Sequence, residues 1–375
     1  MHPQRLFIPG PTPIPPDVLK AMAQQPVSHK SDEFKAIFKR TTENLQKVFK
    51  TENPVLTLTC SGTGAAEAAA QNLVSKGDKA LVIINGRFAQ RWSTMLSRLE
   101  TEVIELHAPW GEVFKSEEIR KVLKENPDCK TVWITHSETS TGILNDIEII
   151  AKTIHEYSDA LICVDAVSSV AGCDIQTDNW KLDIVFSASQ KGLMSPAGLG
   201  FVALSERAWK ITEQNKKRGL YFDLLKARES LQEFVTPWTP AIHSIFALDE
   251  ALKMILNEGL DNVFARHARN SMAMRESMVA LGLKVFNEAS PSPALTVVEL
   301  PRKKFIDVLK KETGITVASG QDDWKDVAFR IGHLGWYFES DILFFIESFE
   351  KALLKTNRKF EKGVGIAAAE NVFKS

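Results

Sequence analysis

Short apolar runs alternate with amphipathic segments over the first two thirds of the chain. Seven of these runs have the length and composition of buried strands, at Val55–Thr59, Ala80–Ile84, Val103–Leu106, Thr131–Thr135, Ala160–Val164, Ile184–Ser187 and Gly200–Leu204. Helical spacing separates most of them, as in Ala65–Val74 and Ser116–Lys124. Strands that alternate with helices predict an α/β domain, with a mainly parallel seven-stranded sheet covered on both faces.

The segment before the first of these strands begins with a proline-rich stretch. Residues 1–16 contain too many prolines for a helix or a central strand. Because Phe7, Ile8 and Ile14 offer apolar surface, we expect an ordered arm that packs against another surface. Helical patterns follow at Asp17–Gln25 and Ser31–Val48.

The pattern changes after about residue 255. It predicts a long helix, two short strands and a further helix, at Asp261–Leu281, Leu295–Glu299, Phe329–Ile331 and Glu339–Leu354. The small apolar residues after Lys362 are compatible with a last helix packed on its neighbour. We therefore predict an N-terminal arm (1–16), a large domain (17–255) and a small C-terminal α+β domain (256–375).

Composition and charge exclude few functions. The 375 residues include 46 basic and 47 acidic side chains, so the net charge of -1 gives no reason to expect nucleic acid or an anionic membrane as partner. No Cys/His cluster has the spacing of metal ligands, so we expect no metal site and free thiols in a reducing compartment, at Cys60, Cys129, Cys163 and Cys173. Without a signal-peptide or membrane-span pattern, a cytoplasmic location is expected.

A glycine-rich turn follows the first predicted strand of the sheet. Ser61–Gly64 opens a helix, where small residues let a ligand approach the backbone and free N–H groups suit a phosphate. The same turn could equally serve packing alone. A dinucleotide site is disfavoured, because Glu67 stands where a third small residue is needed and the next strand ends in Asn85 instead of an acid.

An acid and a lysine follow two later strands. Asp165 comes after Ala160–Val164, where it could cap a helix or face a cationic ligand, since a buried carboxylate needs a partner. Lys191 comes shortly after Ile184–Ser187; lysines at the ends of elements are usually solvated. Ligands of parallel sheets bind at the carboxyl ends of strands, which would gather a phosphate cradle, an acid and an amine. A desolvated amine can form a Schiff base, and an acid keeps a pyridine nitrogen protonated.

Six segments, in this order, resemble the motifs of the class V aminotransferases, a family of fold-type I pyridoxal-phosphate enzymes. They are Gly10–Pro13, Ser61–Gly64, His136–Gly142, Asp165, Ser187–Lys191 and Arg330–Gly332. The resemblance covers almost the whole chain and includes the branch of alanine–glyoxylate, serine–glyoxylate and serine–pyruvate aminotransferases. It implies pyridoxal 5'-phosphate as the cofactor and a fold-type I architecture.

The resemblance also implies roles for individual residues. Lys191 matches the lysine that binds the cofactor covalently and moves protons, Asp165 the partner of the pyridine nitrogen, and Arg330 the arginine that binds the substrate carboxylate. The family's phosphate ligands match Ser61, Gly62, Thr63 and Gln190. Its hydrogen-bond donor beside the ring hydroxyl of the cofactor matches Thr139. Thr239 matches a threonine that reaches the phosphate of a neighbouring subunit, which implies a homodimer with the proline-rich arm across its interface.

Two positions depart from the family pattern. Phe88 stands where relatives often stack a tryptophan on the cofactor ring, and Thr236 stands where some have a tyrosine near the phosphate. A phenylalanine ring can stack as well, with less overlap. The departures therefore concern how the cofactor is bound rather than the reaction that it supports.

The implied reaction is ping-pong transfer of an amino group from alanine, serine or glycine to glyoxylate or pyruvate. The segment with Gly10 resembles the family segment that narrows the site over the substrate, which favours small donors. Aspartate is the alternative donor, because His29 or Lys30 could bind its second carboxylate. Arg87, one residue before Phe88, is a third cation that could do so, but the sequence does not show where its side chain lies.

Other functions on the same scaffold are also considered. A β-eliminating lyase is open, whereas a desulfurase is disfavoured because no cysteine follows Lys191. A nicotinamide dehydrogenase and a non-catalytic binding protein are weaker alternatives.

Overall fold

The seven apolar runs of the large domain form one seven-stranded sheet, as predicted. The computed structural model describes residues 5–216, 219–286, 288, 290–356 and 358–375. The sheet has the order β2-β10-β9-β8-β5-β3-β4, and β10 alone runs antiparallel to its neighbours. Its strands are β2 (Val55–Thr59), β3 (Lys79–Ile84), β4 (Glu102–His107), β5 (Cys129–Thr135), β8 (Leu161–Asp165), β9 (Ile184–Ala188) and β10 (Leu199–Leu204).

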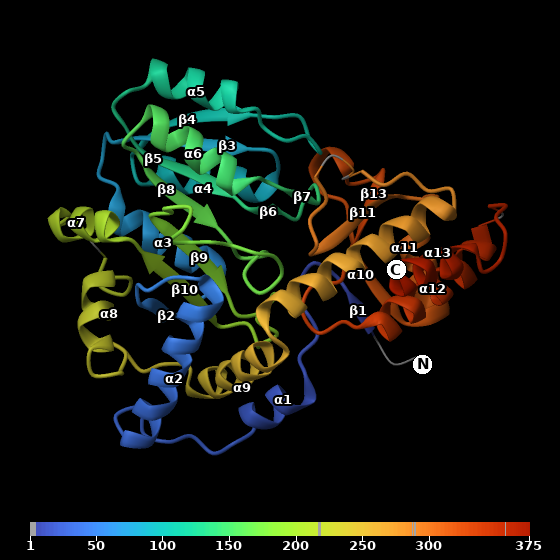
Figure 1. Ribbon diagram of the computed structural model, residues 1–375, viewed down its shortest axis with the longest axis horizontal. Helices are drawn as coiled ribbons and strands as arrows, with labels where there is room; N and C mark the ends of the chain where they lie inside the picture. Colours follow the sequence, from blue (N-terminus) through green and yellow to red (C-terminus); the bar gives the residue numbers. More distant parts are fainter. Residues whose placement is uncertain (1–4, 217–218, 287, 289, 357) are drawn as a thin grey trace.

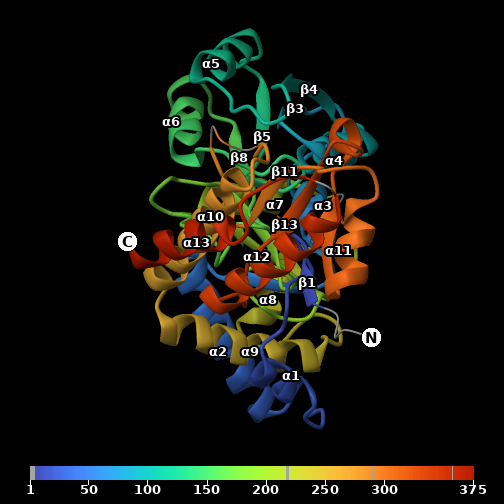
Figure 2. The same ribbon diagram turned by 90° about the vertical axis from the view of Figure 1, so that its right-hand side faces the viewer.

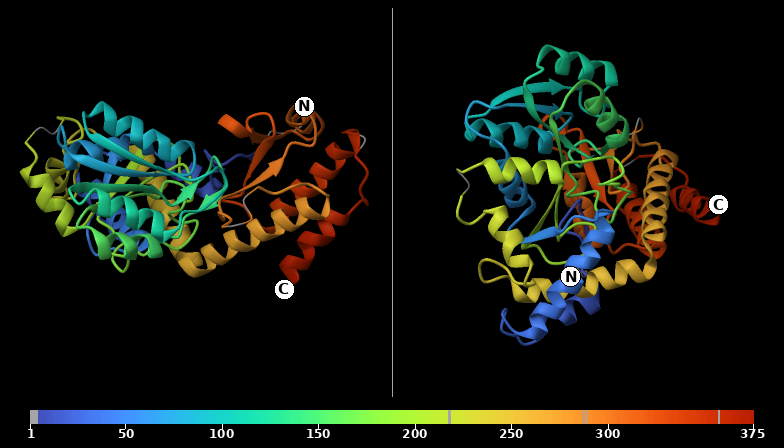
Figure 3. Two further views of the ribbon diagram at one scale, coloured as in Figure 1. Left: turned by 90° about the horizontal axis from the view of Figure 1, so that it is seen from above. Right: turned by 60° about the vertical axis from the view of Figure 1, so that its left-hand side comes forward.

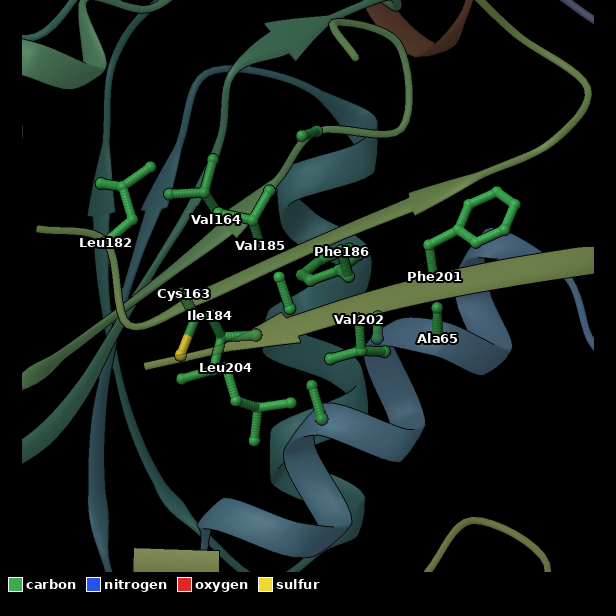
Figure 4. Packing of buried hydrophobic residues seen from close by; sticks show 14 of the residues in the cluster. Ala65, Cys163, Val164, Leu182, Ile184, Val185, Phe186, Phe201, Val202 and Leu204 are labelled. Carbon is green, nitrogen blue, oxygen red and sulfur yellow. The ribbon is translucent and has the colours of Figure 1, made fainter. Parts of the chain in front are cut away.

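Helices pack on both faces of this sheet (Figure 1). They are α2 (Asp32–Phe49), α3 (Gly62–Leu73), α4 (Arg87–Arg98), α5 (Ser116–Glu125), α6 (Ile147–Tyr157), α7 (Glu206–Gln214) and α8 (Leu224–Leu231). Buried side chains of β8, β9 and β10, among them Cys163, Phe186 and Val202, form the core beside α3 (Figure 4). The rings of Phe186 and Trp92 from α4 also pack in a T-shaped arrangement, with centroids 5.2 Å apart. Burial of these apolar surfaces drives the folding of the domain.

The small domain is built on a four-stranded sheet with the order β1-β12-β13-β11. The strands are β1 (Arg5–Phe7), β11 (Leu295–Glu299), β12 (Ile315–Ser319) and β13 (Ala328–Gly332). Its helices are α11 (Phe305–Thr313), α12 (Glu339–Leu353) and α13 (Val364–Lys374), and α12 and α13 lie on its outer side (Figure 2). The predicted last helix after Lys362 is confirmed as α13, which packs against α10.

Two long helices connect the domains. α9 (Ile242–Glu258) packs on α1 (Pro16–Met22) and α2, and α10 (Leu260–Ala280) runs along the small domain (Figure 3). A two-stranded ribbon of β6 (Ser137–Glu138) and β7 (Ile143–Leu144) follows β5. No helix of the described residues is long and apolar enough to span a bilayer.

Some element boundaries differ from the sequence prediction. α3 begins at Gly62 instead of Ala65, because the side chain of Ser61 accepts a hydrogen bond from Gly64 N and caps the helix there. α1 ends at Met22 instead of Gln25, in keeping with Pro26, which disfavours helical backbone at the residue before it. The four cysteines are free thiols, and Cys129 and Cys163 are buried.

The proline-rich arm is ordered and touches both domains of its own chain. Its strand β1 pairs with β12 at the edge of the small sheet, and the buried ring of Phe7 packs against Tyr337 and Phe345. Farther along, Thr12 N donates to Gln190 O at 3.0 Å and Thr12 Oγ1 donates to Lys191 O at 2.9 Å. The arm therefore ties the small sheet to the loop that carries Lys191. Its expected place at a subunit interface stays a prediction.

Removing the ring of Phe7 tests this tie. We expect Phe7→Ala to lower the free energy of unfolding by about 3 kcal/mol, because the ring is only 2% exposed and leaves a cavity. Urea unfolding measures the loss. The control Val279→Ala alters a side chain that is 52% exposed and should change stability by less than about 0.5 kcal/mol. Equal effects of the two substitutions would show that the arm is not held by its core contacts.

Candidate active site

A cavity of about 120 Å³ lies at the carboxyl ends of the parallel strands. Eight of the residues predicted to bind the cofactor line it, namely Ser61, Gly62, Thr63, Phe88, Thr139, Asp165, Gln190 and Lys191. They follow strands far apart in sequence, and the parallel arrangement brings those strand ends to one edge of the sheet. Most of the cavity wall therefore consists of residues that the sequence motifs predict.

The start of α3 forms one end of the cavity. Gly62 packs so closely on Val167 that a Cβ would lie 2.9 Å from Val167 Cγ2. Beside it, Arg91 Nη1 donates to Thr63 Oγ1 at 3.0 Å. The buried Oε1 of Gln190 has no hydrogen-bond partner among the described residues. Helix-start N–H groups, a hydroxyl and a guanidinium are hydrogen-bond donors that fit a phosphate-bearing cofactor at this end.

Asp165 lies at the end of β8 and is almost fully buried. Its carboxylate accepts hydrogen bonds from Val167 N at 2.9 Å and Thr135 Oγ1 at 3.3 Å. Burial raises the pKa of Asp165 to about 7, and the neighbouring Glu138 charge adds to that effect. Asp165 forms no ion pair within the described part of the chain, so a cationic ring nitrogen beside it would lower its pKa again.

Lys191 is held between the large domain and the arm. Burial lowers the pKa of Lys191 to about 8, with a further contribution from the charge of Arg330. Its Nζ donates to Pro9 O at 2.5 Å. Gly10 adopts φ +145°, and a Cβ there would lie 2.6 Å from Lys191 Nζ, so only glycine fits. The predicted substrate residue Gly10 thus lies directly against the amine.

Arg330 reaches toward the cavity from β13 of the small domain. Its Nε donates to Ser319 O and its Nη1 donates to Thr139 O, both at 3.0 Å. Burial lowers the pKa of Arg330 to about 10. Arg330 is not itself part of the cavity wall, but Thr139 is. Two carbonyls, one from each domain, fix the guanidinium without neutralising it.

Several predicted residues are not brought to this cavity. Thr239 is exposed in the loop before α9, and the hydroxyl of Thr236 donates to Trp238 O instead of lying in the cavity wall. His29 and Lys30 lie in the loop before α2 and do not line the cavity. These positions therefore add nothing to the cavity within one chain.

Three wall residues from α4 and β6 were missed by the sequence prediction. Arg91 and Trp92 follow Phe88 at helical spacing, so they share its face, and Ser137 precedes the buried Glu138. The indole Nε1 of Trp92 donates to Thr135 Oγ1 at 3.1 Å, which in turn donates to Asp165. The spacing of three and four residues after Phe88 was the available signal.

The lowered pKa of Lys191 can be tested without any cofactor. Acetylation by acetic anhydride requires the neutral amine, so its rate at Lys191 should rise with pH to a midpoint near 8. Acetylation of ordinary lysines should have its midpoint at about pH 10.4. Peptide mass spectrometry after short pulses at graded pH gives both midpoints in one sample. A Lys191 midpoint close to those of surface lysines would contradict the desolvation of this amine.

Comparison with known proteins assigns the family. Residues 5–325 match the family model Aminotransferase class-V. The chain is 41% identical to the "Soluble hydrogenase 42 kDa subunit" of Anabaena cylindrica, over 98% of each chain. It is 34% identical to a serine–glyoxylate aminotransferase of Methylorubrum extorquens, over 98% of this chain and 95% of that one.

No group of three or more His, Cys, Asp or Glu side chains in the described residues could hold a metal ion.

A solved structure agrees with this assignment. The alanine–glyoxylate aminotransferase of Nostoc sp. superposes with a TM-score of 0.89 at 32% identity, covering 94% of this chain and 96% of that one. The matched fold is the fold-type I architecture predicted from the sequence. The chain therefore belongs to the class V aminotransferases, whose cofactor is pyridoxal phosphate.

Proposed function

We propose that this protein transfers the amino group of a small amino acid, such as alanine, serine or glycine, to glyoxylate or pyruvate by a ping-pong mechanism. The observation that carries the proposal is the meeting of Lys191 and Asp165 in one cavity, with Arg330 bound to its wall. The named activities of the serine–glyoxylate and alanine–glyoxylate relatives support the choice of substrates.

In this proposal the residues of the cavity hold the cofactor from all sides. The phosphate would lie at the start of α3, with the side chain of Gln190 as a further ligand, and Phe88 would stack on the ring. Thr139 would donate to the ring hydroxyl, and Asp165 would keep the ring nitrogen protonated. When bound, the cofactor supplies an electron sink that makes the substrate Cα–H acidic.

Lys191 would carry the protons of the reaction. Because burial brings its pKa to about 8, the amine can take up and return a proton near neutral pH. The carbonyl of Pro9, at 2.5 Å, keeps Nζ at the arm side of the cavity. The arm and Gly10 also exclude water from the amine, which maintains the low polarity that lowers its pKa.

Arg330 would bind the substrate α-carboxylate. Among the described residues, two of its N–H groups donate to protein carbonyls, so the remaining donors of the guanidinium can bind a carboxylate. A planar guanidinium suits bidentate binding of such a group. Since both carbonyl partners are fixed, the position of the carboxylate would be fixed as well.

The charges around the site favour an uncharged substrate side chain. Arg87 pairs with Asp322 at 3.0 Å, and neither His29 nor Lys30 lines the cavity. Arg91 remains, but its contact with Thr63 places it at the proposed phosphate end. A second substrate carboxylate would therefore lack a dedicated partner, which supports small neutral donors over aspartate.

A panel of amino donors tests the function. With fixed glyoxylate or fixed pyruvate, we expect kcat/KM to be highest for alanine, serine or glycine. Arg330→Lys should lower kcat/KM for the best donor by about 10- to 100-fold, because a charge-assisted bidentate contact is lost. Lys191→Ala should remove keto-acid-dependent turnover.

The same panel discriminates among the alternatives. Fast aspartate turnover with slow alanine and serine would overturn the small-donor proposal. Ammonia release without any keto acid would identify a β-eliminating lyase. An Arg330→Lys variant with unchanged kcat/KM would refute the carboxylate role of Arg330.

We also infer that the protein acts as a homodimer. Leu220 and Tyr221 are 75% and 50% exposed, and Tyr221 Oη donates to Thr59 O at the end of β2. Trp238 Nε1 donates to Tyr221 O, so the loop of Thr239 adjoins the same apolar surface. A second copy covering this surface would bring its Thr239 toward the phosphate end, as the resemblance implies.

Sedimentation of a charged variant tests the dimer. We expect Leu220→Asp to shift the protein toward monomer and to weaken cofactor binding, since a charge cannot be buried there without a partner. Leu354→Asp, at a side chain 49% exposed elsewhere, is the matched control and should stay dimeric. Thr239→Ala should weaken cofactor binding while leaving the dimer intact. A fully active wild-type monomer would refute the inference.

A further inference from the structure

Glu138 is a buried carboxylate to which the sequence prediction gave no role of its own. It lies on β6 with no exposed surface, and it forms no ion pair among the residues that the structure describes. Burial raises the pKa of Glu138, although the hydrogen bonds that it accepts from Ser140, Phe88 and Ala89 act in the opposite direction. A buried charge is costly unless hydrogen bonds compensate it, so its contacts show what holds it there.

The carboxylate is saturated by four hydrogen bonds. Oε2 accepts from Phe88 N at 3.0 Å and Ala89 N at 3.1 Å. Oε1 accepts from Ser140 N at 3.0 Å and from Ser140 Oγ at 2.6 Å. Three of these donors are backbone N–H groups, and two of those belong to the first turn of α4.

Helix α4 has no cap from its own N-terminal residue. Gly86 stands at the N-cap position and offers no side chain, while Ser140 Oγ accepts from Arg87 N at 2.9 Å. Glu138 and Ser140 thus satisfy the first three N–H groups of α4, from a segment about fifty residues later. The negative charge also suits the positive end of the helix. A Cβ on Gly86 would collide with Glu138 and Ser140, which explains the glycine there.

The capped helix carries three residues of the cavity wall, Phe88, Arg91 and Trp92. Phe88 is in its first turn, and Arg91 follows three residues later with its guanidinium 4.9 Å from the Phe88 ring centroid. Thr139, between Glu138 and Ser140, also lines the cavity and accepts from Arg330. One carboxylate therefore joins the aromatic wall to the loop that orients Arg330.

We propose that Glu138 is a positioning residue, which fixes Phe88 against the cofactor by capping α4 from the core. The inference rests on the proposed function, because it assumes that Phe88 stacks on the cofactor ring. Glu138 itself touches neither cofactor nor substrate in this assignment. Its contribution reaches the site through the backbone of Phe88 and Ala89.

A double-mutant cycle on cofactor affinity tests the proposal. Glu138→Gln keeps the shape, but its Nε2 is a donor and cannot accept from backbone N–H groups. We expect the Kd for pyridoxal phosphate to rise about 10-fold and the visible circular dichroism of the bound cofactor to weaken. In a Phe88→Ala background, Glu138→Gln should raise the Kd no further, because the coupled ring is already absent.

Hydrogen exchange tests the cap without cofactor. In the apoprotein, Glu138→Gln should speed exchange at the Phe88 and Ala89 amides, because a neutral amide replaces their charged acceptor. Asp146→Asn is the matched control, since Asp146 Oδ1 caps α6 by accepting from Ile149 N at 3.0 Å on the surface. It removes the same charge at another helix start and should leave the Kd unchanged. If Glu138→Gln does not fold, Ser140→Ala removes the acceptor of Arg87 N and enters the same cycle.

The outcomes separate the two proposals. Additive effects of the Glu138 and Phe88 substitutions, or unchanged exchange at Phe88 and Ala89, would overturn the positioning role. So would an unchanged Kd in the Glu138 variant. Wild-type protein that binds no pyridoxal phosphate would instead refute the proposed function, while the exchange result still reports on the cap.

Discussion

The carboxyl edge of the large sheet buries charged groups without giving them full counter-charges. Lys191 donates to the carbonyl of Pro9, and Arg330 donates to those of Ser319 and Thr139. Asp165 accepts from a backbone N–H and a hydroxyl. Dipoles orient each group but do not neutralise it, so each keeps an unmet charge for a ligand. The other features of the site follow from the need to hold these groups in place at low polarity.

The same constraint explains why two domains and the arm must meet here. The carbonyl partners of Arg330 come from different domains, and the partner of Lys191 comes from the arm. The Arg87–Asp322 pair also joins the domains, but both side chains are about half exposed, so it contributes at most about 1 kcal/mol. The buried contacts of the arm, anchored by Phe7 and Thr12, therefore fix the domain geometry more firmly than surface charge does.

The sequence predicted what depends on local pattern and missed what depends on distant partners. The seven strands were found because each contains a short, mainly apolar run, and Asp165 and Lys191 because they follow such runs. Arg91 was missed because an arginine on an amphipathic helix is usually solvated, and only its contact with Thr63 places it at the cavity. The cap of α4 by Glu138 was hidden for a related reason, since its acceptor lies about fifty residues from the helix. The short strand β1 was missed as well, because it gains its partner β12 only when the arm folds back onto the small domain.

The pKa shifts show how cofactor and fold depend on each other. The pKa of Asp165 is raised to about 7 from 3.8 because burial opposes its ionised form. The resulting loss of folding stability grows as the pH rises from 3.8 to 7. The pKa of Lys191, lowered to about 8 from 10.5, means that burial opposes its charged form, a cost fully present below 8 and gone above 10.5. Near pH 7 to 8 both groups therefore destabilise the protein without cofactor. A protonated ring nitrogen would offset the first cost, and covalent capture of the neutral amine would remove the second. The cofactor would thus relieve two groups that are costly to bury, so tight binding and stability would rise together.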